Sequence, residues 1–135
     1  MPTATAVQVI APFRRAVTAL VATTKVPTYG WLPDSPAELP CQVVGRPSLR
    51  ESGTAGVMTA TLDVTLLGRR ISDEDSQMEL DTLADQLFLA LGGTKNMRVG
   101  ELIVRCTLFL PGTVPVAELT YPAYIASVST ETLTC

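Results

Sequence analysis

The chain has 135 residues, of which 47% are hydrophobic and 17% are charged. A chain of this length buries roughly two thirds of its unfolded surface around one core, and a composition this apolar excludes an intrinsically disordered protein. Thirteen acidic residues against ten basic ones give a formal net charge of −3, which disfavours a DNA-binding protein. We therefore expect one folded domain over residues 1–135.

The residue types that are missing exclude most catalytic sites. The sequence contains no histidine, which removes Ser-His and Cys-His nucleophile pairs, imidazole base catalysis and His-containing zinc sites. Three widely spaced cysteines, Cys41, Cys106 and Cys135, favour reduced thiols in a cytosolic chain. An enzyme with Cys41 or Cys106 as nucleophile is the alternative, but no histidine can activate the thiol. We predict no enzyme activity, no catalytic residue, no cofactor and no metal.

No membrane contact is expected either. No stretch approaches the roughly eighteen consecutive apolar residues that a membrane-spanning helix needs. The N-terminus lacks the basic region and apolar core of a signal peptide.

An amphipathic helix is expected near the N-terminus. Pro12 is tolerated in a first turn, so the helix is predicted to begin close to residue 10. The proline-rich stretch that follows, residues 25–40, predicts extended chain with turns, with an extra short strand near residues 27–32 as an alternative. The apolar residues of the helix recur at spacings of three and four: Val7, Ile10, Phe13, Val17, Leu20 and Val21.

Alternation of apolar and polar residues predicts strands in the middle of the chain. Within the predicted strand 57–67, residues 58–66 alternate between apolar and polar, which indicates one buried and one polar face. Residues 39–45 form a shorter predicted strand with Leu39, Cys41 and Val43 on one face. The eleven residues between them, 46–56, have no apolar period and exceed the roughly two to five residues of a usual hairpin loop. We expect a mobile loop there until a partner orders it.

A second helix is predicted over residues 72–91. Ser72 is the expected N-cap, acidic residues fill the first turn, and Gly92-Gly93 supplies the stop. Two more strands are predicted, at 123–130 and at 99–110, the latter ended by Pro111-Gly112. One face of that strand should carry Leu102, Val104, Cys106, Leu108 and Leu110.

The order helix, strand, strand, helix, strand, strand predicts an α+β fold. We expect a single mixed or antiparallel sheet with both helices packed on one face.

The charged clusters have local explanations and one functional alternative. Acidic residues at a helix start are favoured by the helix dipole, and the two arginines just before it are expected to form local ion pairs. Alternatively, these two arginines, and likewise Arg14 and Arg15 of the first helix, meet the acidic cluster of a neighbouring copy in a ring. Together with the predicted loop, the candidate interface residues are Arg50, Glu51, Arg69, Arg70, Asp73 and Glu74.

The order of these elements resembles the tail terminator proteins of long-tailed bacteriophages. The resemblance rests on a strand that ends in Arg69-Arg70, the acidic helix start Ser72-Asp73-Glu74-Asp75, the helix from Leu80 to Leu91, and the closing Tyr121-Pro122-Ala123-Tyr124.

The resemblance implies a ring, commonly hexameric, that caps the finished tail tube, ends its polymerisation and joins it to the head connector. Its partners would be other copies of the chain, the tail tube protein and the head-tail connector or stopper protein, with DNA only passing through the lumen. Its location would be the tail and neck of the virion, after assembly in the host cytoplasm. Another connector component, such as a stopper or tail-completion protein, and a non-viral binding module remain alternatives.

Overall fold

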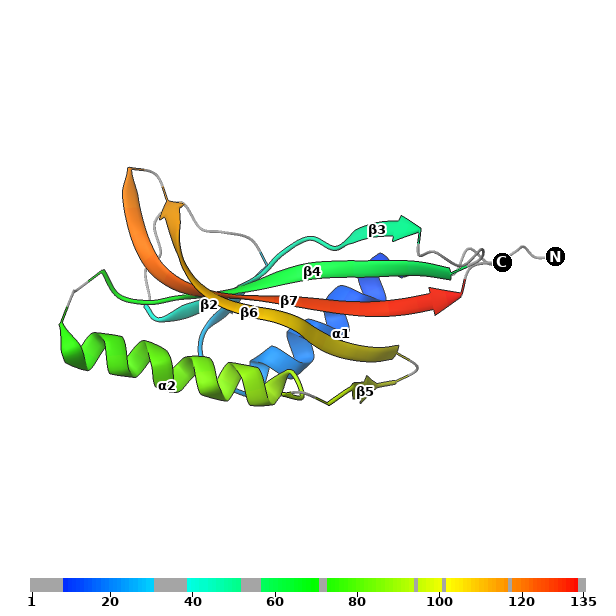
Figure 1. The fold of residues 1–135 in the computed structure, drawn as a ribbon, viewed down its shortest axis with the longest axis horizontal. Helices are drawn as coiled ribbons and strands as arrows, with labels where there is room; N and C mark the ends of the chain where they lie inside the picture. The colour runs from blue at the N-terminus through cyan, green and yellow to red at the C-terminus, as the bar shows by residue number, and fades with distance from the viewer. Residues whose placement is uncertain are drawn as a thin grey trace.

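The computed structural model describes residues 9–30, 39–51, 57–70, 73–93, 95–100, 102–116 and 118–133. Two helices and seven strands lie in this part of the chain (Figure 1). The helices are α1 (Ile10–Ala22) and α2 (Glu74–Ala90). The strands are β1 (Thr28–Tyr29), β2 (Cys41–Val44), β3 (Ser48–Glu51), β4 (Val57–Leu67), β5 (Met97–Val99), β6 (Leu102–Val116) and β7 (Leu119–Leu133).

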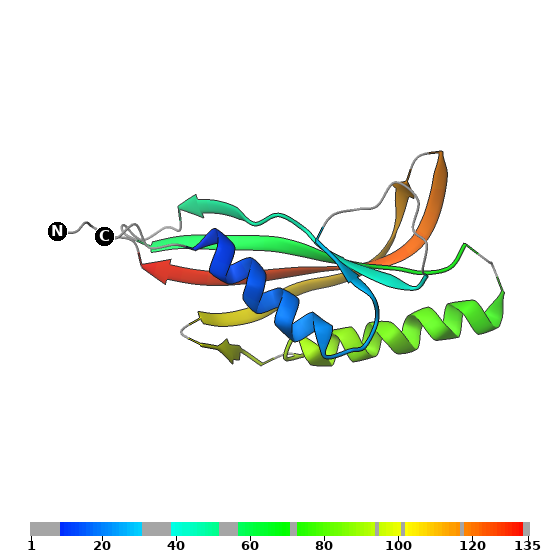
Figure 2. The same ribbon diagram turned by 180° about the vertical axis from the view of Figure 1, so that it is seen from behind.

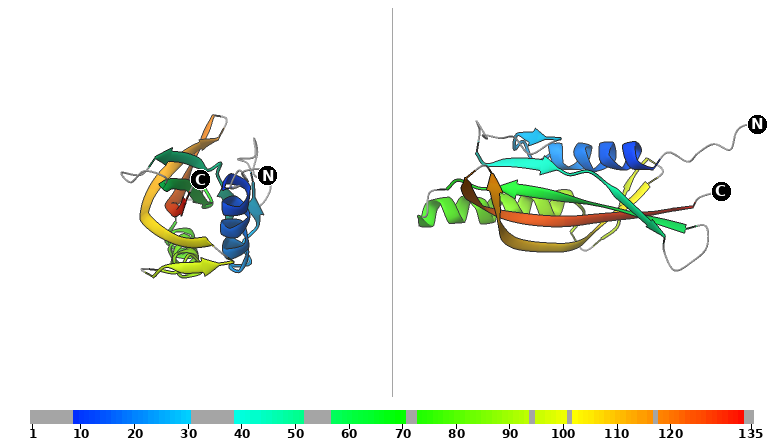
Figure 3. Two further views of the ribbon diagram at one scale, coloured as in Figure 1. Left: turned by 90° about the vertical axis from the view of Figure 1, so that its right-hand side faces the viewer. Right: turned by 90° about the horizontal axis from the view of Figure 1, so that it is seen from above.

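The strands form one mixed sheet in the order β1-β2-β4-β7-β6-β5, with β3 paired to the other half of β4. Only the pairing of β1 with β2 is parallel among the described strands. The view from behind shows α1 lying across the sheet, and the end view shows the sheet curled around both helices (Figures 2 and 3). The predicted α+β class, with one sheet and both helices on one face, is confirmed, although the sheet has more strands than predicted.

The main core lies between the helices and the concave side of the sheet, here called the helix face. Phe13, Val17 and Val21 of α1 are fully buried against Leu66 of β4 and Leu87 of α2. The predicted start of α1 at residue 10 is confirmed. Ile10, however, was predicted to be on the buried face and is 48% exposed; the predicted core residue Val7 lies outside the described residues.

Both ends of α2 are fixed by backbone and side-chain hydrogen bonds. Asp73, not Ser72, is the N-cap, and its Oδ1 accepts a 2.7 Å hydrogen bond from the Ser76 amide; Ser72 itself lies outside the described residues. At the other end the Gly93 amide donates to the Phe88 carbonyl and the Gly92 amide to the Leu89 carbonyl. This is a Schellman ending, which needs the positive φ of 96° that Gly92 adopts. The predicted glycine stop is confirmed.

The predicted loop at 46–56 is wrong in its first half. Ser48–Glu51 pairs with Met58–Thr61 as the edge strand β3. All four of its side chains are exposed, so the sequence has no apolar alternation there that would predict a strand. It forms because the outer edge of β4 would otherwise leave backbone groups unpaired.

A β-bulge in β6 overturns the predicted face of that strand. Cys106 pairs with Val128 and Leu108 with Ser127, so Thr107 is an extra residue. One inserted residue turns every later side chain to the opposite face. Val104 therefore stays in the core, whereas Leu108 and Leu110 point to the other, open face and are 51% and 50% exposed.

The strand β6 does not stop at Pro111-Gly112, as predicted, but continues to Val116. Its last part pairs with the first part of β7 and forms an arm that projects beyond the rest of the sheet (Figure 1). The Pro122 carbonyl accepts from the Gly68 amide on the β4 side. Because Pro122 directs its backbone groups to β4, the opposite residue of β6, Thr113, directs its own away from β7. Pro111 and Pro115, two residues to either side, therefore also direct their nitrogens to the unpaired edge of β6. Proline is tolerated there because no ladder hydrogen bond is lost.

The start of the predicted strand at 99–110 is a tight hairpin instead. Met97–Val99 folds back on residues 102–104 as β5, with Gly100 at a φ of 61° between them. A small second core on the open face anchors the arm: Val116, Tyr121 and Ala123 pack against Cys41, Val43 and Leu67. The predicted short strand near residues 27–32 is confirmed as β1.

Because of the bulge, Leu110 is half exposed, so it should contribute less to the free energy of unfolding than the buried Leu66. Replacing the buried Leu66 by alanine is expected to lower the free energy of unfolding by about 2 to 5 kcal/mol, because it leaves a cavity. The same change at the half-exposed Leu110 is expected to cost less than about 1 kcal/mol. Urea denaturation at low protein concentration measures both. Equal losses at the two positions would contradict the register after Thr107.

The N-cap gives a pH-dependent prediction. Its hydrogen bonds with Ser76 hold the pKa of Asp73 below its ordinary value, so its contribution to stability is complete above about pH 4 and is lost as the pH falls through the lower folded-state pKa. Asp73→Ala should lower Tm at pH 7, and this deficit should shrink in acid. Asp73→Ser, which keeps a capping oxygen, should retain most of the wild-type Tm at pH 7. A deficit that is the same at every pH would contradict the role of the carboxylate.

Candidate assembly surfaces

The side chains that a nucleophile or metal site of this chain would draw on are its cysteines, aspartates and glutamates. The described residues contain no cluster of three or more Cys, Asp or Glu side chains able to hold a metal ion. Burial raises the pKa of the Cys106 thiol, which disfavours the reactive thiolate. Cys41 is fully buried under the arm, and Cys135 lies outside the described residues.

The arginines Arg69 and Arg70 both have partners within their own chain. Arg69 Nε lies 3.1 Å from Glu79 Oε1, and both side chains are about half exposed. Arg70 Nε donates to the Thr120 carbonyl at 3.4 Å, and its guanidinium carbon lies 5.9 Å from the centre of the Tyr121 ring. These contacts tie the start of α2 and the end of β4 to the arm. The predicted local ion pair is thus confirmed for Arg69, whereas Arg70 forms no ion pair among the described residues and contacts the arm instead.

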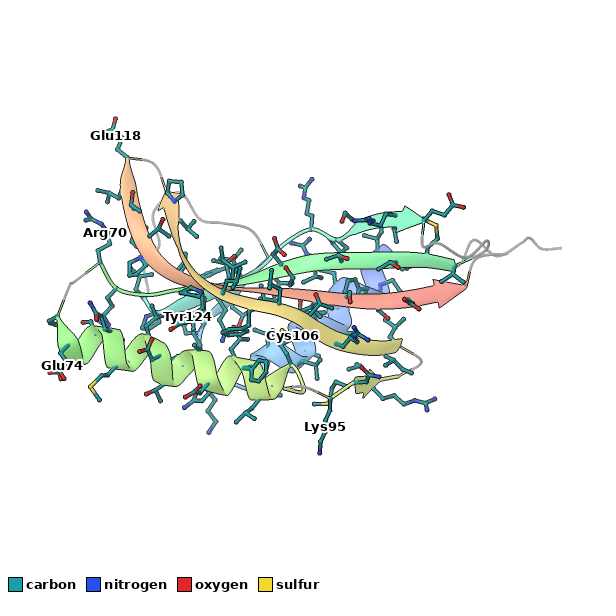
Figure 4. All side chains as sticks on the ribbon, viewed as in Figure 1. Arg70, Glu74, Lys95, Cys106, Glu118 and Tyr124 are labelled. Carbon is teal, nitrogen blue, oxygen red and sulfur yellow. The ribbon has the colours of Figure 1, made fainter. Side chains whose placement is uncertain are left out.

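The candidate interface residues fall into two separate groups. Arg70 and Glu74 lie at the end of the molecule from which the arm projects (Figure 4), where Asp73 and Arg69 are their chain neighbours. Arg50 and Glu51 lie on the edge strand β3, paired to Thr59 and Met58, toward the other end (Figure 1). All these side chains are exposed, but the fold does not bring the two groups together.

A contact between α2 and the sheet sets the position of this helix. The Tyr124 hydroxyl donates to Asp81 Oδ1 at 2.8 Å, and this hydrogen bond, together with the charges of Asp81 and Asp85, raises the pKa of Tyr124. Beside it, the Phe88 and Phe109 rings meet edge to face at 5.5 Å. The outward face of α2 is therefore held at a fixed angle to the sheet.

Sequence reasoning missed a groove on the outer side of α1. It measures about 900 Å³ and is bounded by the exposed face of α1 and by the link between β2 and β3. Its lining is apolar and basic, with Ile10 and three arginines, Arg14, Arg15 and Arg46. The Arg14 guanidinium is engaged with the Gly30 and Val44 carbonyls. Arg15 and Arg46 have no hydrogen-bond or ion-pair partner among the described residues.

The outer face of α2 carries the opposite charge. The helix contains five carboxylates, Glu74, Asp75, Glu79, Asp81 and Asp85, and no basic residue. Within the described residues only Glu79 forms a salt bridge. Two large apolar side chains stand among them, Met78 at 59% and Leu89 at 70% exposure. The sequence predicts Met78 on the apolar stripe of this helix together with Leu80, but Met78 is exposed because two residues along a helix place it on nearly the opposite side from Leu80.

The described residues contain no helix that is both long and apolar enough to cross a membrane. The exposed apolar residues are instead scattered over several elements, with Leu49 on β3, Ile103 on β6 and Leu119 on the arm in addition to those above.

Replacing Arg69 separates the local interpretation from the interface hypothesis. Because its ion pair with Glu79 is half exposed, Arg69→Ala is expected to lower the free energy of unfolding by at most about 1 kcal/mol and to leave the assembly state unchanged. Denaturation and analytical ultracentrifugation measure these two quantities. Loss of an oligomer with unchanged stability would instead favour a contact between Arg69 and a neighbouring copy.

No protein-family model matches the chain, and no curated protein matches it.

Proposed function

We propose that the chain is a structural subunit of a ring that closes the tail tube of a long-tailed bacteriophage, stops its growth and joins it to the head connector. In this role the protein has no substrate. Its partners are other copies of itself, the tail tube protein and the connector protein above it.

The observation that carries the proposal is the exposure of large apolar side chains on two different sides of one small domain. Ile10 borders the groove on α1, whereas Met78 and Leu89 are exposed on α2. The two helices lie along different sides of the molecule (Figure 3). The groove on α1 is a continuous, largely apolar surface, and such an exposed surface is often covered by a partner. A ring needs two different contact surfaces on each subunit, because its contacts run head to tail.

The projecting arm gives the proposal a second support. It extends two strands beyond the sheet and exposes Leu119 and Glu118 near its tip. The small core around Tyr121 and Arg70's contact with Thr120 hold it in place. An anchored arm of this kind suits contact with a partner above or below the plane of a ring, such as the tube or the connector.

The charge balance is compatible with DNA passing through such a ring. The net charge of −3 multiplies with the number of copies, and a lumen with excess negative charge repels phosphate groups. DNA is then a cargo and not a ligand.

Electron microscopy of the purified protein, alone and mixed with tail tubes that lack heads, tests the proposal. We expect rings, and density at one end of each tube that stops further addition of tube protein. Binding to isolated head connectors without binding to tubes would favour a stopper. Monomers at high concentration with bare tube ends would refute the proposal and favour a binding module.

A further inference from the structure

We infer that the groove on α1 is the seat for α2 of a second copy of the chain, packed antiparallel with Arg15 of one copy opposite Asp85 of the other. The inference rests on the proposed ring and identifies the pair of surfaces that would join its subunits.

The strand edges are poor sites for joining copies. The unpaired edge of β6 presents Pro111 and Pro115, which have no N–H to donate, and β3 carries Arg50 and Glu51 on the edge of the sheet. Proline and charge on an edge strand both prevent the addition of another strand. A contact between copies is therefore more favourable on the helix surfaces than along the sheet.

The exposed ridge of α1 consists of three small residues and one arginine. Ala11, Arg15, Thr18 and Ala22 are all exposed and follow one another at spacings of four, three and four. All four line the groove. Small side chains let a second helix approach closely, at an axial distance of about 8 Å to 10 Å.

The exposed ridge of α2 has the same spacing and complementary side chains. Met78, Thr82, Asp85 and Leu89 are all exposed and also follow at four, three and four. The two apolar side chains stand at the ends of this ridge. Eleven residues separate Met78 from Leu89, and eleven separate Ala11 from Ala22, which is about 16 Å in each helix at 1.5 Å per residue.

Only one direction of packing also matches the charges. In the antiparallel arrangement Leu89 covers Ala11, Asp85 faces Arg15, Thr82 faces Thr18 and Met78 covers Ala22. In the parallel arrangement Arg15 faces Thr82, and Asp85 faces Thr18.

Arg46 also borders the groove of α1 and adds to its positive charge. The groove on α1 thus has a net positive charge and the outer face of α2 a net negative charge. Among the described residues, only Glu79 of these groups has an ion-pair partner in its own chain. Complementary patches of this kind set partner, register and rate of encounter. In a closed ring each subunit is held on both sides, so a contact of one helix pair on each side gains from the raised effective concentration.

Charge reversal at the two facing positions tests the inference. Arg15→Glu and Asp85→Arg are each expected to raise the concentration at which half of the protein is assembled by roughly a hundredfold, because each places like charges opposite one another. The double variant Arg15→Glu/Asp85→Arg restores the pair with reversed sign and should recover most of the assembly. Arg98→Glu, the same charge change on the exposed edge of β5, is the matched control and should have no such effect.

Assembly is measured by analytical ultracentrifugation and by ring density at tube ends, with circular dichroism to verify the fold of each variant. Rings that form normally in both single variants would overturn the inferred contact and leave the proposed function standing. Assembly that is lost on removal of residues 1–8, yet is unchanged in the charge variants, would also overturn it, because the chain's own N-terminal segment would then be the occupant. A wild-type protein that is monomeric in solution and at tube ends would refute both the contact and the ring.

Discussion

One extra residue, Thr107, determines which surfaces the protein presents. Before it, Val104 and Cys106 of β6 face the helices; after it, Phe109 takes the core position and Leu108 and Leu110 turn to the open face. The same shift places Val114 and Val116 on the open face, where they form the second core with residues of β2 and β4. A strand without the bulge would bury Leu108 and Leu110 and would leave the arm without its apolar anchor.

Two prolines on the edge of β6 make the extent of this strand hard to predict, and the same prolines prevent another strand from pairing with it. Pro111 reads as the end of a strand, because proline is rare inside a sheet. In the fold it lies on the unpaired edge of β6, so its missing N–H breaks no hydrogen bond of the sheet. Another strand that approached this edge would also find no N–H donor at this position. Pro115, four residues later, lies on the same edge and has the same effect. The arm can therefore be long without becoming a template for aggregation.

Local patterns predicted the elements whose own side chains decide their structure. The alternation of residues 58–66 predicts β4, and the start of α1 and the glycine end of α2 follow from spacing and backbone freedom. The failures within the sheet all depend on a partner strand. Ser48–Glu51 becomes a strand only because β4 offers an edge, and the face of Leu110 depends on a register with β7 that no local window contains. Likewise, Ser72 and Asp73 are both acceptable N-caps, and only the geometry of the first turn selects Asp73.

The candidate interface residues show a similar division between composition and placement. Sequence reasoning selected the charges next to turns, and Arg69 and Arg70 turn out to have local partners. It missed the separation of charge between the two helices: α1 has two arginines and no carboxylate, whereas α2 has five carboxylates and no base. A net charge of −3 averages over this separation. Within one chain the outer faces of α1 and α2 do not meet, and in the inferred contact the α2 of a second copy would supply the charge that complements α1.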